Sequence, residues 1–114
     1  MMMKNRSSLD PGKDMYTYSL ESSLTTKVKK WLGEQPDVFF YKASDRYQKG
    51  VSDIIACVGG TFVAMELKAK NGTATPHQKL FIAEVIKAGG IAGECFTLHE
   101  VKVLVAKARR RNGI

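Results

Sequence analysis

Apolar residues in the middle of the chain form two short runs separated by a pair of glycines. Within residues 51–67 both runs are rich in Val, Ile, Phe and Thr, and Gly59 and Gly60 lie between them. Glycine tolerates the positive φ angles of a tight two-residue turn, so the pattern predicts a β-hairpin. Such a turn pairs Val58 with Thr61 and thereby fixes the register of both strands.

This register brings two acidic residues together. Continued to the strand ends, it places Asp53 opposite Glu66, and the alternation of side chains puts Lys68 and Lys70 on the same face. The remaining positions of both faces are apolar, which is typical of strands covered on two sides. The face opposite the charges carries Ile54, Ala56, Val63, Met65 and Leu67.

Two carboxylates in opposed positions repel each other. At about 5 Å the repulsion is roughly 3 kcal/mol for an effective dielectric constant near 20. Solvated ion pairs with the two lysines are one way to offset it. A divalent cation that prefers oxygen ligands, such as Mg²⁺, is the other. With a lysine two residues beyond the glutamate, the second explanation points to metal-assisted phosphodiester hydrolysis.

The segments around the hairpin predict the remaining elements. Thr75, Pro76 and Gln78 form a capping box with proline at the first helical position, and Thr97 with Glu100 repeats the box pattern. A strand, a helix and a strand in succession predict a parallel crossover, so the sheet is expected to be mixed. The predicted order is αβββαβα, an α/β domain: a helix over 19–33, a strand over 37–43, the hairpin, a helix over 75–88, a strand over 91–97 and a helix over 97–108.

The chain length of 114 residues predicts one domain. Residues 1–18 lack periodicity and contain a Pro-Gly break, which favours a mobile N-terminal arm. Residues 19–108 form the predicted domain, and residues 109–114 form a basic C-terminal tail. The chain has 18 Lys and Arg against 11 Asp and Glu, a formal charge of +7. Such an excess favours binding to a polyanion.

The two cysteines lie inside apolar runs and are interpreted as small core residues of a reduced, cytoplasmic protein. A zinc site formed by Cys57, His77, Cys95 and His99 is the alternative, although no paired ligand spacing supports it. No apolar stretch reaches the length of a membrane span, and no signal-peptide core is present at the N-terminus.

The sequence resembles a known nuclease family. Asp53 followed by Glu66-Leu67-Lys68 is similar to the D…(D/E)-x-K signature of restriction-endonuclease-like nucleases. The stretch "KGVSD…VAMELKAKNGTATPHQ" more closely resembles the VRR-NUC (virus-type replication-repair nuclease) domain, over residues 21–90. Ser52 stands where that family usually has proline, at a position that shapes strand entry.

The resemblance implies a restriction-endonuclease-like fold and a role for each matching residue. Asp53 and Glu66 would bind Mg²⁺ or Mn²⁺ together with the Leu67 backbone carbonyl, and Lys68 would orient or activate the attacking water. Glu21 matches the family's first-helix acid as a further metal-binding or catalytic residue, and helical spacing places it on the core-facing stripe. A first-turn acid that complements the helix dipole is its alternative role. Gln78 matches the glutamine that the family has on its next helix and would be a further catalytic residue, although the capping box alone would explain it.

The resemblance further implies a homodimer of phage or bacterial type that cuts branched DNA, with four-way junctions as the preferred substrate. Flap-directed or nick-directed cleavage is the alternative within nuclease chemistry. Two other classes stay open: a non-catalytic nucleic-acid-binding module, and a carboxylate-pair hydrolase such as a glycosidase.

Overall fold

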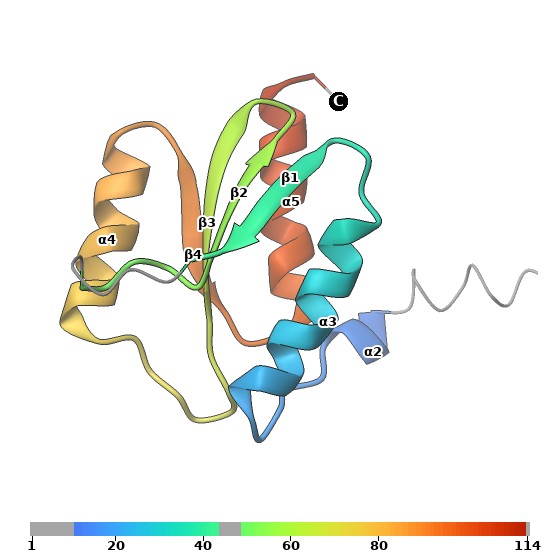
Figure 1. Cartoon of the computed structure of the whole chain (residues 1–114), viewed down its shortest axis with the longest axis vertical. Coiled ribbons are helices and arrows are strands. Elements are labelled where there is room, and N and C mark those ends of the chain that lie inside the picture. Colours follow the sequence, from blue (N-terminus) through green and yellow to red (C-terminus); the bar gives the residue numbers. More distant parts are fainter. Residues whose placement is uncertain (1–10, 44–48, 114) are drawn as a thin grey trace, which may run out of the picture.

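The structure of the chain is a computed structural model that describes residues 11–43 and 49–113. Helices α3 and α5 lie on one side of a four-stranded sheet and α4 lies on the other (Figure 1). No helix in these two ranges is long and apolar enough to cross a membrane. The elements are α2 Pro11–Asp14, α3 Glu21–Gly33, β1 Val38–Lys42, β2 Ile54–Val58, β3 Thr61–Leu67, α4 Pro76–Lys87, β4 Ile91–Cys95 and α5 Leu98–Arg111.

The sheet has the strand order β1-β2-β3-β4. Strands β1, β2 and β3 pair antiparallel, and β4 joins β3 in parallel after the α4 crossover. The predicted mixed sheet is therefore confirmed. The hairpin register is also confirmed, because Val58 pairs with Thr61 and Ile54 with Met65 across the Gly59-Gly60 turn.

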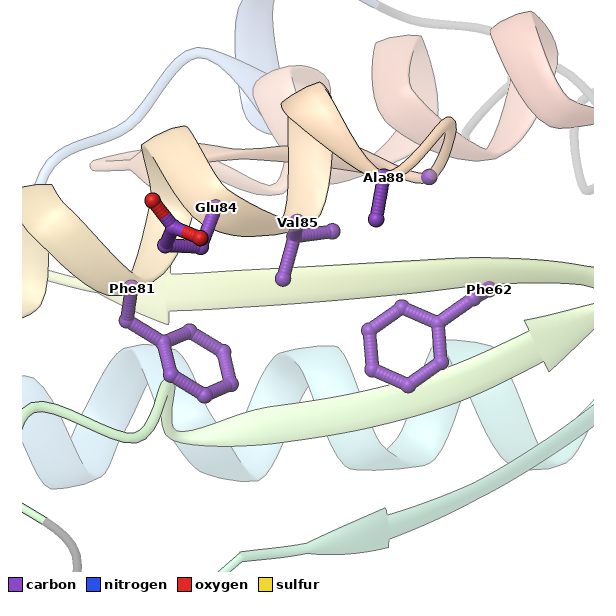
Figure 2. Close-up of a pocket in the computed structure, with 6 residues that line it drawn as sticks. Phe62, Phe81, Glu84, Val85 and Ala88 are labelled. Carbon is purple, nitrogen blue, oxygen red and sulfur yellow. The ribbon is translucent and has the colours of Figure 1, made fainter.

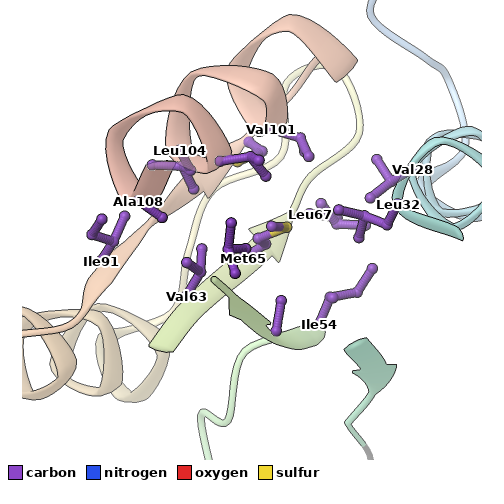
Figure 3. Packing of buried hydrophobic residues seen from close by; sticks show 14 of the residues in the cluster. Val28, Leu32, Ile54, Val63, Met65, Leu67, Ile91, Val101, Leu104 and Ala108 are labelled. Carbon is purple, nitrogen blue, oxygen red and sulfur yellow. The ribbon is translucent and has the colours of Figure 1, made fainter. Parts of the chain in front are cut away.

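The core lies between the sheet and the helices α3 and α5. We call this side of the sheet the core face. Leu24, Val28 and Leu32 recur at helical spacing on α3 and are fully buried. They pack with side chains of β2, β3 and α5 in one cluster (Figure 3). The strand and α5 members of this cluster include Ile54, Val63, Met65, Leu67, Ile91, Val101, Leu104, Val105 and Ala108.

The other side of the sheet, which we call the open face, is covered only in part. Helix α4 contacts β3 and β4, and none of its side chains is fully buried. Phe39 and Tyr41 on the edge strand β1 are 70% and 53% exposed, and Phe62 on β3 is 46% exposed. The prediction that both faces of the hairpin are covered is therefore wrong for part of β2, where Cys57 is exposed, and for part of β3.

A groove separates α4 from the sheet on the open face. It has a volume of about 340 Å³ and is almost entirely apolar. In Figure 2 the rings of Phe62 and Phe81 lie beside each other below Val85. The helix therefore leaves apolar surface accessible next to Phe62.

Both predicted helix starts have side-chain caps. At α4 the capping box is complete: the Thr75 hydroxyl accepts from the Gln78 N–H, and the Gln78 side chain accepts from the Thr75 N–H. At α5 the Thr97 hydroxyl accepts from the Glu100 N–H. The Glu100 carboxylate accepts instead from the N–H of Phe96, one residue before the cap. The predicted capping box at α5 therefore differs from a standard one in that the Glu100 carboxylate binds the N–H before the cap residue and not that of the cap residue itself.

The C-terminal arginines belong to α5, which continues to Arg111 and not only to residue 108 as predicted. Arg109 forms two hydrogen bonds with the Asp37 carboxylate, at 2.9 and 2.7 Å. Asn112 donates to the Val58 carbonyl at 3.2 Å and to the Thr61 hydroxyl at 2.8 Å. These contacts join the end of α5 to the closed end of the hairpin. The predicted basic tail is therefore at the opposite end of the hairpin from Asp53.

The predicted N-terminal arm contacts the domain from residue 11 onward, whereas residues 1–10 lie outside the described residues. Asp14 is buried and forms an ion pair with Lys102 at 2.8 Å. The carbonyl of Tyr18 accepts from the backbone N–H of Lys70 at 2.8 Å. Lys70 lies beyond the end of β3, and its side chain is exposed.

Candidate active site

Asp53 lies directly before β2, at the open end of the hairpin. Its Oδ2 accepts a hydrogen bond from the Leu67 N–H at 2.8 Å, and its own carbonyl accepts from Ala43 at 2.8 Å. The first bond joins the entry of β2 to the end of β3, and the second joins it to the segment after β1. Asp53 is thus held through its carboxylate on one side and through its backbone on the other.

Glu66 lies on β3, next to Asp53 across the hairpin, and its side chain is only 1% exposed. Burial and the nearby Asp53 charge raise the pKa of Glu66 to about 7, although Lys68 acts in the opposite direction. Its Oε2 lies 3.3 Å from the Lys68 Nζ. Its Oε1 is buried and has no hydrogen-bond partner among the described residues. A buried carboxylate oxygen without a partner is unfavourable unless a cation or a donor completes it.

Lys68 follows on the same face and is held by α4. Its Nζ donates to Gln78 Oε1 at 2.9 Å, and the same oxygen accepts from the Thr75 N–H at 2.9 Å. The capping box and the lysine therefore share one acceptor atom. An ammonium group has three N–H donors, so Gln78 and Glu66 leave one for a further ligand. Capping and a role in the site are thus compatible for Gln78.

Glu21 is the first residue of α3, and its side chain is exposed, so the prediction that it lies on the core-facing stripe is wrong. Partial burial and the Asp53 charge raise the pKa of Glu21, whereas Lys68 and Lys42 lower it. These interactions place it within electrostatic reach of the acid pair. Within residues 11–43 and 49–113, however, no three His, Cys, Asp or Glu side chains come close enough to share an ion.

The arrangement of oxygens suits a divalent cation held by two carboxylates. Asp53 uses Oδ2 for the Leu67 N–H and keeps Oδ1 for another ligand. Glu66 presents its unpartnered Oε1, and the mutual repulsion of the two acids would be cancelled by a positive ion. Leu67 lies between Glu66 and Lys68 at the end of β3, where its carbonyl was predicted to join the ligands.

Two further residues near the site, Gly50 and Glu94, were not predicted to contribute. Gly50 has a φ of +83°, and a Cβ there would overlap the His77 backbone, so it allows the segment before Asp53 to touch the start of α4. Glu94 on β4 is the register partner of Glu66. Its position follows only from the parallel pairing of β3 and β4. For Gly50, the one signal in the sequence was its place three residues before Asp53 in the stretch "KGVSD".

The zinc hypothesis is wrong for the described residues. Cys57 is exposed on the open face, whereas Cys95 is buried on the core face. Burial raises the pKa of the Cys95 thiol and so disfavours the thiolate that zinc requires. No cluster with metal-ligand geometry includes either of them in the described ranges. The prediction of a core position is therefore confirmed for Cys95 only.

Two solved structures share the architecture of this chain. One, described as "VRR_NUC domain protein", superposes with a TM-score of 0.66 at 19% identity, over 83% of this chain and 91% of its own. The other, described as "VRR_NUC domain", superposes with a TM-score of 0.60 at 21% identity, over 75% of this chain and 94% of its own. The chain has the VRR-NUC fold. The resemblance predicted from sequence is thus confirmed at the level of fold.

The VRR-NUC fold is supported by structural similarity alone. No protein-family model and no curated protein matches the sequence. At about 20% identity, structural similarity is informative about backbone architecture but does not assign side-chain chemistry. The roles of Asp53, Glu66 and Lys68 therefore depend on the geometry of the site.

Proposed function

We propose that this protein is a divalent-metal-dependent endonuclease that hydrolyses phosphodiester bonds in DNA. The observation that carries the proposal is the pairing of the half-buried Asp53 with the buried Glu66, whose unpartnered oxygen lies beside a lysine held by Gln78. A binding module does not need two repelling acids in a partly buried position. The VRR-NUC names of the two structural neighbours support nuclease chemistry.

The cation would be Mg²⁺ or Mn²⁺, held by the carboxylates of Asp53 and Glu66 and the carbonyl of Leu67. Both ions prefer oxygen ligands, and these three groups offer only oxygen. When bound, such an ion polarises a phosphate oxygen and lowers the pKa of a coordinated water. Glu21 is proposed as an additional acid on the α3 side of the site.

Lys68 is proposed to position the attacking water or the scissile phosphate. The Lys68 side chain is only 11% exposed, and its ammonium group is held by Glu66 and Gln78. The third N–H of the ammonium group therefore has a restricted direction. A donor that is already oriented loses little entropy when the substrate arrives. Gln78 acts by holding this donor, and Thr75 holds Gln78 through the capping box.

A polyanionic substrate agrees with the charge of +7. We propose branched DNA, with the four-way junction as the preferred form and flaps or nicks as the alternative. A domain of this size offers one active site, whereas paired cuts in two strands require two. A two-fold homodimer would place two sites in a symmetric relation that matches the junction.

The open face supports a homodimer. Phe39 and Tyr41 lie on β1, which is an edge strand of the sheet in the described part of the chain. Their rings are 6.5 Å apart, and both are largely exposed. Together with Phe62 and the groove beside α4 they form an apolar surface. Exposed surface of this kind is a common feature of protein interfaces.

The proposal is tested by incubating the protein with end-labelled linear, flapped and four-way DNA, with Mg²⁺, with Mn²⁺ or with EDTA. We expect metal-dependent products, with paired symmetric nicks in the four-way substrate. Cleavage that persists in EDTA would contradict the metal-dependent reaction. Binding without cleavage under all conditions would favour the non-catalytic module, and cleavage of flaps alone would leave the nuclease and remove the junction assignment.

A further inference from the structure

A groove lined by polar and charged residues runs along α3 and opens next to the candidate active site. Its volume is about 500 Å³. It lies between one flank of α3 and the end of β1, so it is separate from the apolar groove on the open face. The lining residues are Glu21, Ser22, Thr25, Thr26, Lys29 and Lys42.

The groove has a defined direction relative to the acids. Glu21 stands at one end, where it interacts electrostatically with Asp53, Lys68 and Lys42. Lys29 lies eight residues further along the same flank of α3, which corresponds to about 12 Å at 1.5 Å per residue. The groove therefore leads away from the site with one lysine near the acids and one at the far end.

The donors in this groove are mainly cationic. Thr25 and Thr26 each donate their hydroxyl to a backbone carbonyl one turn earlier, at 3.0 Å, so these protons are already used. Lys29 and Lys42 are exposed and carry two positive charges. Among the described residues that line the groove none is aromatic, so these residues offer bases no surface on which to stack. This combination suits phosphate groups.

We infer that this groove binds the sugar-phosphate backbone of the DNA strand next to the phosphate being cut. The inference rests on the proposed nuclease function and names a substrate-binding surface for it. The groove is about 12 Å long, which gives room for more than one successive phosphate of the strand. Lys42 would contact the phosphates nearest the cut, and Lys29 those further away.

The test is DNA binding in EDTA, where cleavage does not occur, measured by fluorescence anisotropy over a range of salt concentrations. The variants are Lys29→Ala, Lys42→Ala and their combination. Lys87→Ala and Lys107→Ala are matched controls, because these exposed lysines lie near the C-terminal ends of α4 and α5 and carry the same charge. All four substitutions are on the surface, and a thermal melt of each variant checks its fold.

We expect each groove substitution to lower the slope of log Kd against log salt by about one. The ratio of Kd at 200 mM salt to Kd at 50 mM salt should then fall roughly three- to fourfold for each lysine removed. The controls should keep the wild-type ratio. Equal slopes for groove and control variants would overturn the inference.

The same assay separates this inference from the proposed function. If the wild type binds DNA with the predicted dependence on Lys29 and Lys42 but does not cut under any metal condition, the groove stands and the nuclease proposal fails. If the wild type cuts DNA while the groove variants match the controls in binding, the nuclease stands and the groove assignment fails.

Discussion

Glu66→Gln is expected to stabilise the metal-free protein at alkaline pH. The pKa of Glu66 is raised from 4.5 to about 7. One pKa unit corresponds to 1.36 kcal/mol, so the ionised carboxylate lowers the free energy of unfolding by roughly 3 kcal/mol. Glutamine has a similar shape without the charge, and it therefore removes this penalty.

The sign of the pH dependence follows from the direction of the shift. The folded state holds the Glu66 proton more tightly than the unfolded chain, so the penalty is absent below about pH 4.5, grows as pH rises and is complete above about pH 7. The difference in unfolding free energy between Glu66→Gln and wild type should be small at pH 5 and approach ~3 kcal/mol at pH 8.

Urea unfolding in EDTA, followed by circular dichroism at pH 5, 6.5 and 8, measures this difference. Glu84→Gln serves as the control, because Glu84 is exposed on α4. Saturating Mg²⁺ at pH 8 should stabilise the wild type more than Glu66→Gln, since only the wild type keeps both carboxylates. If the difference in unfolding free energy stays constant from pH 5 to pH 8, Glu66 is not the acid whose ionisation destabilises the folded protein.

Three other substitutions test separate parts of the account. Gly50→Ala should cost roughly 2 kcal/mol or more, because of the positive φ and the overlap with the His77 backbone; an unchanged melting temperature would contradict this. Gln78→Leu should reduce cleavage without changing the affinity for the cation. Thr75→Ala should mainly lower the free energy of unfolding, by about 1 kcal/mol. An equal loss of cleavage in both variants would show that helix capping alone matters. Sedimentation should give twice the 12.6 kDa chain mass for wild type, and Phe39→Ser should give the monomer; a monomeric wild type would exclude the homodimer.

Features that depend on neighbouring residues in the sequence could be predicted well. The Gly59-Gly60 turn fixes the register of β2 and β3, and that register alone brings Asp53 and Glu66 together. The capping box at Thr75 is a four-residue pattern, so its start was also predictable.

Features that depend on the packing of distant elements were predicted poorly. The apolar residues of α4 gave no sign that this helix would cover only part of the open face and leave Phe39 exposed. Glu21 has the same spacing as the core residues of α3, but it lies at the first turn, where the helix extends past the core. The Arg109–Asp37 pair joins residues 72 positions apart, and no local pattern indicates it.

The central claim is that Asp53, Glu66 and Lys68 form a metal-dependent centre for phosphodiester hydrolysis. The most direct measurement is the single-turnover cleavage rate of a labelled four-way DNA in Mg²⁺ for wild type, Asp53→Asn, Glu66→Gln and Lys68→Ala. Lys70→Ala is the matched control, because its exposed side chain lies two residues beyond Lys68. We predict that the first three variants bind the DNA and do not cut it, and that Lys70→Ala cuts at a rate close to wild type. Wild-type cleavage rates in the three site variants would contradict the account.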